Sequence, residues 1–288
     1  MRDYVILTDS CCDLSARLVK ELHLTVLPLS FYLEGREYFN YPDNRDIDPR
    51  DFYAKLRGGA LGTTSAVSTG MFEATMSRLV EEGKDVLCIS FSSGLSTTYQ
   101  SACIAAAEVM DAHPESKVLV VDSLCASLGQ GLLVYLAALE KAKGRSIEEV
   151  RDFAEERKLH ICHWFTVDDL NHLKRGGRVS AAAALFGTML HMKPVLHVDG
   201  EGHLIPVDKV RGRKASIQAV LEQMNQLVED PSVVFISHGD CEEEAVALGK
   251  AIREKYPVDK LVINFVGPVI GNHSGPGTLA LFFQGKHR

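Results

Sequence analysis

Short apolar runs alternate with segments of helical periodicity along the first half of the chain. The apolar runs predict buried strands at residues 4–7, 24–29, 85–91 and 118–122. Amphipathic or strongly apolar segments predict helices at residues 14–22, 49–56, 71–81, 129–142 and 147–158. Strands that alternate with helices at this spacing predict an α/β fold with a parallel sheet covered by helices on both faces.

The second half has a different order of elements. Its pattern predicts strands at residues 160–167, 194–198, 203–207, 233–237 and 261–266, and helices at 167–174, 180–191, 214–228 and 242–256. Two of the strands flank a Gly-containing turn and predict a hairpin, whereas the later ones are joined by helical crossovers. We therefore expect a parallel three-layer domain at residues 1–158 and a smaller α/β domain with a mixed sheet at residues 159–288.

The stretch VLCISFSSGLSTTYQSACIAA, residues 86–106, predicts a strand, a polar turn and a helix in succession. Unpaired backbone N–H groups and the positive end of the helix dipole favour an anion at such a turn. Ser93 and Ser96 add hydroxyl donors on either side of Gly94, and Ser96 is the expected N-cap. The turn has no Lys or Arg, so it suits a carboxylate better than a phosphate. A capped helix without a ligand is the alternative.

A second hydroxyl-rich segment, TTSAVS, precedes the helix predicted at residues 71–81. Because the carboxyl ends of parallel strands meet at one edge of a sheet, we expect the polar turns to converge there. The residues expected at this edge are Thr8, Asp9, Ser10, Thr64, Ser65, Ser93, Ser96, Asp122 and Ser123. The sequence has no glycine-rich nucleotide motif and no GxSxG nucleophile motif.

Composition and charge exclude several classes of protein. The chain has 288 residues, of which 46% are hydrophobic and 24% charged, as is typical of a globular protein. Its net charge of -7 argues against nucleic acid as the main partner. No apolar run approaches the roughly 20 residues of a spanning helix, and the first apolar run is too short for a signal peptide. We expect a cytoplasmic protein without integral membrane contact, and at most transient contact with a membrane surface.

The cysteines and histidines do not predict a metal site. The 7 cysteines include no CxxC pair, so neither a disulfide framework nor a thiolate zinc site is expected. His160 and His163 flank Cys162, but strand alternation is expected to leave both imidazoles exposed. We therefore predict no metal and no cofactor.

Two segments of the second half are candidates for a ligand-binding role. Residues 180–192, SAAAALFGTMLHM, are apolar nearly all round, which predicts a helix that is buried or lines an apolar cavity. Residues 267–277, GPVIGNHSGPG, are too rich in Gly and Pro for regular structure, and they carry His273 as a candidate hydrogen-bond donor or proton shuttle. A histidine that only packs the loop is the alternative. The residues expected to line the cavity are Ala184, Leu185, Met189 and Ile270.

Four arginines lie in two basic segments of this acidic chain. Arg175 and Arg178 lie in KRGGR, and Arg211 and Arg213 lie in VRGRK. Arginine raises encounter rates and pairs bidentately with carboxylates or phosphate, so these residues are candidates for docking a partner. Solvated surface arginines are the alternative.

The ordered set of motifs resembles the DegV family of bacterial fatty-acid-binding proteins over essentially the whole chain. The motifs are TDSCCDL, TTSAVS, SSGLSTTYQSA, VDSLCASLGQGLLV, LNHLKRGGRVS, KPVLHVDGEGHLIPVDKVRGRKAS and GPVIGNHSGPGTLALFF. The resemblance implies a parallel α/β domain, a smaller domain with a mixed sheet, and a fatty acid between the two. Two departures stand out: TSAVS replaces the usual TSQPS, and LSTTY replaces LSGTY, which places Thr97 where the family has glycine.

The resemblance also implies which residues meet the ligand. The carboxylate of the fatty acid is expected to contact Thr64 and either Ser93 or Ser96, with His273 nearby, and Ser65 and Gly94 beside them. Some family members serve as the acyl-carrying subunit of a fatty acid kinase, in which a separate ATP-binding subunit phosphorylates the carboxylate. This implies a long-chain fatty acid and a kinase subunit as partners.

Two other functions are open at this point. One is a lipid carrier or store without a kinase partner. The other is a hydrolase that uses Ser93 with His273, although GxSxG and a clear third member of a triad are absent from the sequence. We expect a ligand-binding protein and not a self-sufficient enzyme.

Overall fold

The computed structural model describes residues 2–179 and 191–288, whose strands form three sheets. The first is a parallel sheet with the strand order β2-β1-β6-β7. Its strands are β1 (Tyr4–Asp9), β2 (Thr25–Leu27), β6 (Asp85–Ser90) and β7 (Val118–Asp122). These are the four strands expected in the first half, and their predicted parallel arrangement is confirmed.

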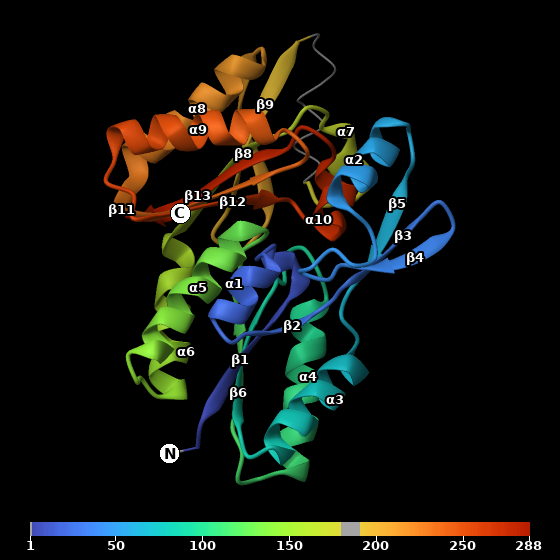
Figure 1. Cartoon of the computed structure of the whole chain (residues 1–288), viewed down its shortest axis with the longest axis vertical. Helices are drawn as coiled ribbons and strands as arrows, with labels where there is room; N and C mark the ends of the chain where they lie inside the picture. Colours follow the sequence, from blue (N-terminus) through green and yellow to red (C-terminus); the bar gives the residue numbers. More distant parts are fainter. Residues whose placement is uncertain (1, 180–190) are drawn as a thin grey trace.

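Helices cover both faces of the parallel sheet because its strands are apolar on both sides. On β1, Ile6 packs with α1, α5 and α6, whereas its neighbour Leu7 packs with α3 and α4 on the opposite face. Figure 1 shows the two groups of helices on either side of the strands. The helices are α1 (Ala16–Glu21), α3 (Thr69–Glu81), α4 (Thr98–Ala112), α5 (Leu128–Ala142) and α6 (Ile147–Arg157), and short 3-10 turns occur at η1 (Ser10–Cys12) and η2 (Lys158–His160).

The second half forms a mixed sheet with the order β10-β9-β8-β13-β11-β12. Only β11 and β12 pair in parallel among its described strands, so the predicted mixed sheet is confirmed. The strands are β8 (Ile161–Thr166), β9 (Met192–Val198), β10 (Leu204–Arg211), β11 (Val228–His238), β12 (Lys260–Phe265) and β13 (Leu279–Gly285). The sequence pattern did not identify β13.

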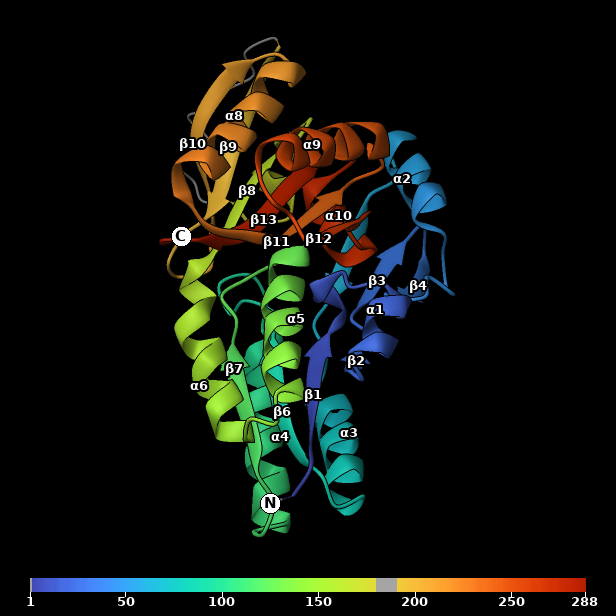
Figure 2. The ribbon, with the colours of Figure 1, turned by 60° about the vertical axis from the view of Figure 1, so that its left-hand side comes forward.

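The mixed sheet lies across the end of the parallel sheet toward which β1 runs (Figure 2). The helices α8 (Arg213–Leu227) and α9 (Glu242–Lys255) pack on one face of the mixed sheet. The helix α5 packs against the other face, where Phe235 and Phe282 share one buried cluster with Leu132. The two halves therefore share a core, and the domain boundary expected at residue 158, within η2, stays a prediction.

A small third sheet, of order β4-β3-β5, projects beside this junction. Its strands are β3 (Ser30–Leu33), β4 (Arg36–Phe39) and β5 (Gly62–Ser65), and α2 (Pro49–Arg57) follows β4. The sequence pattern missed this sheet, because β4 and β5 are polar. It wrongly placed Thr64 in a turn, whereas Thr64 lies on β5 and pairs with Phe31.

The segment expected to be irregular at residues 267–277 contains a helix, α10 (Pro268–Ser274). Proline fits the first turn of a helix because its missing N–H has no intrahelical partner there. Buried Pro268 and Val269 then fix the helix by packing, and Gly275 ends it at φ 79°. A further short helix, α7 (Asn171–Arg175), confirms part of the helix predicted at 167–174.

Candidate functional site

A cavity of about 440 Å³ lies where the carboxyl edge of the parallel sheet meets the mixed sheet. Both halves of the chain and the small sheet line it. Much of the wall is apolar: Leu29, Phe91, Leu95, Phe165, Leu173, Val198, Leu204, Val266, Val269, Ile270, Ala280 and Phe282. Of the residues expected to line a tunnel, Ile270 is therefore on the cavity, whereas Ala184, Leu185 and Met189 lie outside the described residues.

All six residues expected near a carboxylate line this cavity: Thr64, Ser65, Ser93, Gly94, Ser96 and His273. Thr64 and Ser65 come from β5, and His273 comes from the last turn of α10. The others come from the turn between β6 and α4. The structure thus brings together hydroxyl groups and an imidazole from three distant parts of the chain.

His273 and Thr64 form the central polar contact of this group. The Nε2 atom of His273 lies 2.8 Å from Oγ1 of Thr64. Burial, together with the smaller effect of the nearby charge of Arg178, lowers the pKa of His273 to about 4. The imidazole is therefore neutral at physiological pH, with one nitrogen as donor and the other as acceptor.

Gly176, at the carboxyl end of α7, leaves the space that the His273 ring occupies. A Cβ atom on Gly176 would lie 2.1 Å from Nδ1 of His273, so only glycine fits at this position without moving the ring. Arg178 lies nearby on the cavity wall, where Nη1 donates to the carbonyl of Gly176 at 2.6 Å. The KRGGR segment therefore contributes to the cavity wall beside His273.

Internal hydrogen bonds fix the turn between β6 and α4. Ser93 N donates to Asp122 Oδ1 at 3.2 Å, and Phe91 N donates to Asp9 Oδ2 at 2.7 Å. The fully buried Ser92, whose role the sequence did not predict, donates through Oγ to Gly202 O at 2.9 Å, in the turn between β9 and β10. Gly94 also lies against the hairpin of β9 and β10, because a Cβ atom at Gly94 would be 3.0 Å from the carbonyl oxygen of Gly202.

Ser96 does not occupy the expected N-cap. The helix α4 begins at Thr98, and its N-cap is Thr97, whose side chain forms no capping hydrogen bond. Ser96 Oγ instead accepts from the Thr98 N–H at 3.2 Å and lies 2.8 Å from the Thr98 hydroxyl. The prediction was therefore wrong by one residue, although Ser96 still satisfies a backbone donor of the first turn.

Several residues expected at the polar edge of the parallel sheet do not line the cavity. They form hydrogen bonds beneath the cavity wall. Asp9 is fully buried, and burial raises its pKa to about 6. Thr8 donates to Ile89 O at 2.7 Å, and Ser10 Oγ accepts from the Leu29 N–H at 3.0 Å. Together with Asp122 and Ser123, these side chains position the turns.

His163 is buried, which overturns the expectation that it is exposed. Its Nε2 atom lies 3.3 Å from the Ala126 N–H, and its Nδ1 atom lies 2.8 Å from Ile161 O. Gly129 leaves room for the ring, because a Cβ atom there would lie 2.0 Å from Nε2. His163 therefore links β8 to the segment that leads into α5. His160 is half-buried and contacts Gly285 O through Nδ1 at 3.1 Å.

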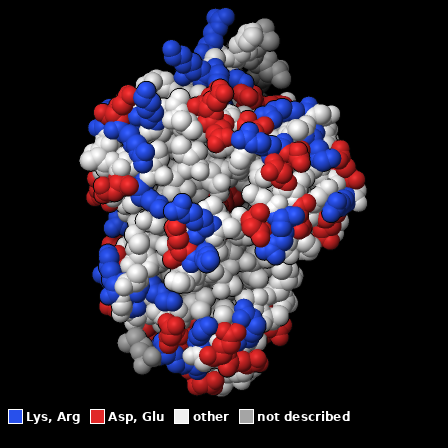
Figure 3. All heavy atoms as spheres, viewed as in Figure 1, with Lys and Arg blue, Asp and Glu red and all other residues white. Residues whose placement is uncertain are grey.

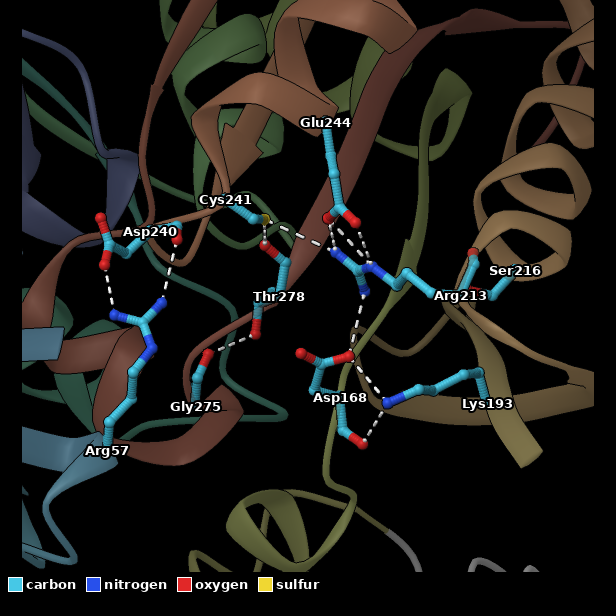
Figure 4. Close-up of polar contacts among 10 residues, drawn as sticks. All are labelled: Arg57, Asp168, Lys193, Arg213, Ser216, Asp240, Cys241, Glu244, Gly275 and Thr278. Atoms are coloured by element: carbon cyan, nitrogen blue, oxygen red, sulfur yellow. Dashed lines mark hydrogen bonds and ion pairs between the residues drawn. The ribbon is translucent and has the colours of Figure 1, made fainter. Parts of the chain in front are cut away.

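The four candidate docking arginines fall into different environments. Arg175 and Arg211 are exposed, and Arg178 lines the cavity. Arg213 is engaged inside the chain: its guanidinium pairs with Glu244 at 2.5 Å and lies 3.8 Å from Asp168 (Figure 4). Arg211 and Arg213 also do not lie in a free loop, because they end β10 and begin α8.

The visible surface carries a mixture of charges. Figure 3 shows acidic and basic side chains interspersed over most of one face, with basic side chains gathered at the end where β10 meets α8. In the described part of the chain, no helix is long and apolar enough to cross a membrane.

Comparisons with known proteins agree over nearly the full length. A family model described as "Uncharacterised protein, DegV family" matches residues 3–286. A DegV domain-containing protein of Clostridium perfringens is 43% identical over 287 residues, covering 99% of this chain and 98% of that protein.

Solved structures show the same fold. A DegV family protein from Thermus thermophilus, described for its fatty acid binding, has a TM-score of 0.88 at 33% identity, covering 99% of this chain and 100% of that chain. A stearic acid-binding protein from Eubacterium ventriosum has a TM-score of 0.86 at 25% identity, covering 98% of each chain.

Proposed function

The chain belongs to the DegV family, and from this premise we propose that it binds a long-chain fatty acid in the cavity between its parallel and mixed sheets. The carboxylate lies at the end of the cavity that holds Thr64, Ser93, Ser96 and His273. The hydrocarbon chain lies against the apolar wall. The observation that carries this proposal is the hydrogen-bonded pair of Thr64 and neutral His273 on the wall of a largely apolar cavity.

The donors of this pair match the needs of a carboxylate. An ionised carboxylate accepts hydrogen bonds but donates none. If His273 carries its proton on Nε2, it donates to Oγ1 of Thr64, and the Thr64 O–H is free to donate to the ligand. Ser93 and Ser96 hydroxyls add further donors, and Arg178 supplies a positive charge on the same wall. Hydrogen bonds to a charged acceptor are stronger than those between neutral groups.

The hydrocarbon supplies most of the affinity. Burying about fifteen methylenes at roughly 0.8 kcal/mol each offers on the order of 12 kcal/mol before the costs of association. A carboxylate without partners would lose much of this gain, because desolvating a charge is costly. The polar end therefore sets the orientation of the ligand, and the apolar wall sets the strength of binding.

The proposal is tested by identifying the ligand and then rebinding it. Organic extracts of the purified protein should contain a long-chain fatty acid by mass spectrometry. Delipidated protein should gain thermal stability from added fatty acid, by about 2.7 kcal/mol at a hundred times the dissociation constant. No stabilisation by any fatty acid across a range of chain lengths would overturn the proposal.

We further propose that the bound fatty acid is presented to an ATP-binding kinase subunit, which phosphorylates its carboxylate. Support comes from the resemblance to acyl-carrying subunits and from the exposed Arg175 and Arg211 as docking residues. Loaded protein, ATP and a candidate kinase subunit encoded nearby should form acyl phosphate, and delipidated protein should not. A lipid carrier without a kinase partner is the function that remains if no such subunit binds the loaded protein.

The hydrolase alternative is less well supported by the geometry. Among the described residues, the hydrogen-bond partner of His273 Nε2 is Thr64 and not Ser93. A Ser–His pair needs a direct hydrogen bond between nucleophile and base. The arrangement therefore favours binding over hydrolysis.

A further inference from the structure

A chain of buried polar side chains other than the Thr64–His273 pair reaches the cavity wall. Ser127 Oγ donates to Asp13 Oδ2 at 2.5 Å and lies 2.9 Å from Ser237 Oγ. Asp13, Ser127 and Ser237 have exposed fractions of 6%, 5% and 0%, respectively. Ser127 and Ser237 line the cavity, whereas Asp13 lies behind them. We call these three residues the serine relay.

The backbone of Ser127 is strained to hold this position. Ser127 precedes α5 with φ 53° and ψ −145°, a conformation that disfavours residues with a Cβ atom. Strain of this kind persists only where surrounding contacts enforce it, and it gathers at functional sites. At Ser127 the strained backbone coincides with the buried hydrogen bonds to Asp13 and Ser237.

The order of donors in the serine relay leaves an acceptor at the cavity. Burial raises the pKa of Asp13 to about 7, so its carboxylate is mostly ionised at pH 8 and only accepts hydrogen bonds. The Ser127 hydroxyl then donates its hydrogen bond to Asp13, and Ser127 Oγ accepts a hydrogen bond from the Ser237 hydroxyl. Ser237 Oγ keeps a free lone pair, which suits a ligand group that donates.

A second hydroxyl on the same cavity has no partner. Ser274 Oγ is buried, with its residue 4% exposed, and it forms no hydrogen bond in the described part of the chain. Ser274 also lines the cavity. Buried hydroxyl groups in native proteins nearly always find a partner, so a polar group of the ligand is the natural candidate.

The neighbouring polar groups do not compete for this role. Both ring nitrogens of His163 are engaged by the backbone, at Ala126 and Ile161. Thr278 Oγ1 donates to Gly275 O at 2.8 Å. An unsubstituted hydrocarbon chain would offer Ser237 and Ser274 no hydrogen bond.

We propose that Ser237, at the cavity end of the serine relay, forms a second polar subsite, which selects acyl chains that carry a hydroxyl group. A hydroxyl donates to Ser237 Oγ, whereas a ketone only accepts and leaves the Ser237 lone pair unused. This inference rests on the proposed binding of fatty acids, and it names the class of fatty acid.

The test compares matched ligands on the delipidated protein at pH 8. Dissociation constants are measured for stearic acid, for stearic acids with one hydroxyl at successive carbons, and for the ketone at each of those carbons. We expect at least one hydroxy acid to bind about fivefold or more tightly than stearic acid, and more tightly than its matched ketone. If stearic acid binds and no hydroxy acid binds more tightly, the inference is overturned while the proposed function stands. If no ligand binds, the proposed function itself fails.

Variants then assign the selectivity to Ser237. Ser237→Ala should bring the ratio of the hydroxy acid and stearic acid constants toward one, and Ser116→Ala, a buried serine outside the cavity, should leave this ratio as in the wild type. If Ser237→Ala does not fold, Ser237→Cys keeps the shape with a weaker acceptor and should reduce the ratio. An unchanged ratio in the folded Ser237 variant would also overturn the inference.

Discussion

Thr64 and His273 are 209 residues apart in the chain, and a hydrogen bond of 2.8 Å between Thr64 Oγ1 and His273 Nε2 joins β5 to α10. The contact fixes the imidazole on a cavity wall that neither element could form alone. Because burial keeps the imidazole neutral, the pair acts through hydrogen bonds and not through charge.

Removing the Thr64 hydroxyl should weaken binding of the acid selectively. Thr64→Val keeps the shape of the side chain but removes its donor to the carboxylate. Hydrogen bonds to charged groups contribute roughly 1.5 to 3 kcal/mol, so we expect about 10-fold to 100-fold weaker binding of a fatty acid by calorimetry. Its methyl ester should lose much less, and Thr64→Ser should retain most of the affinity.

The same comparison identifies the serine that contacts the carboxylate. Ser93→Ala and Ser96→Ala are each measured with the acid and its ester, and the variant with the selective loss marks the contact. Equal losses for acid and ester in all three positions would show that Thr64, Ser93 and Ser96 shape the cavity without recognising the head group.

Filling the space at Gly176 should displace His273. In Gly176→Ala, the new Cβ would meet Nδ1 of His273 at 2.1 Å, so the ring must move and the contact with Thr64 is lost. We expect about tenfold weaker fatty acid binding. Gly200→Ala is the matched control, because a Cβ atom at Gly200 meets nothing within 4 Å. Wild-type affinity in Gly176→Ala would show that the position of the ring does not matter for binding.

The two arginines near the start of α8 should differ in their effect on stability. Arg213→Ala leaves Glu244 and Asp168 without their guanidinium partner, and we expect a loss of about 1.5 to 3 kcal/mol in the free energy of unfolding. Exposed Arg211→Ala should change it by less than about 0.5 kcal/mol. Urea denaturation measures both free energies, and equal stability of the two variants would contradict this assignment. Docking of a partner is therefore better tested with Arg211 and Arg175 than with Arg213.

The buried carboxylate of Asp13 should make stability fall as pH rises. Burial raises its pKa in the folded protein to about 7, above the value of roughly 3.9 of an unfolded chain. Its contribution to stability is therefore fully present below pH 4 and is lost as pH rises through 7. Asp13→Asn removes this titration, so the melting temperature of the variant relative to the wild type should rise between pH 5 and pH 8. If the melting temperatures of the two proteins change with pH in parallel, Asp13 is not a buried carboxylate that titrates in this range.

The pattern of apolar and polar residues was sufficient to predict those helices and strands whose buried side chains recur at a regular spacing. The parallel sheet could be predicted because its strands are continuous apolar runs, buried on both faces, as with Ile6 and Leu7. The polar turn after β6 could be predicted for the same reason, since a strand and a helix bracket it. The motif order also pointed to the family, because it extends over the whole chain.

Tertiary structure decided the elements whose sequences are locally ambiguous. Polar β5 becomes a strand because it pairs with β3, and α10 forms despite its glycines because Pro268 and Val269 are buried. His163 is buried because Gly129, distant in sequence, leaves space for its ring. Ser237 looked like one polar residue in an apolar strand, and only folding placed its hydroxyl beside Ser127 on the cavity wall. Periodicity reports which face of an element is buried, but it carries no information on which distant groups meet there, since those contacts depend on how the elements pack.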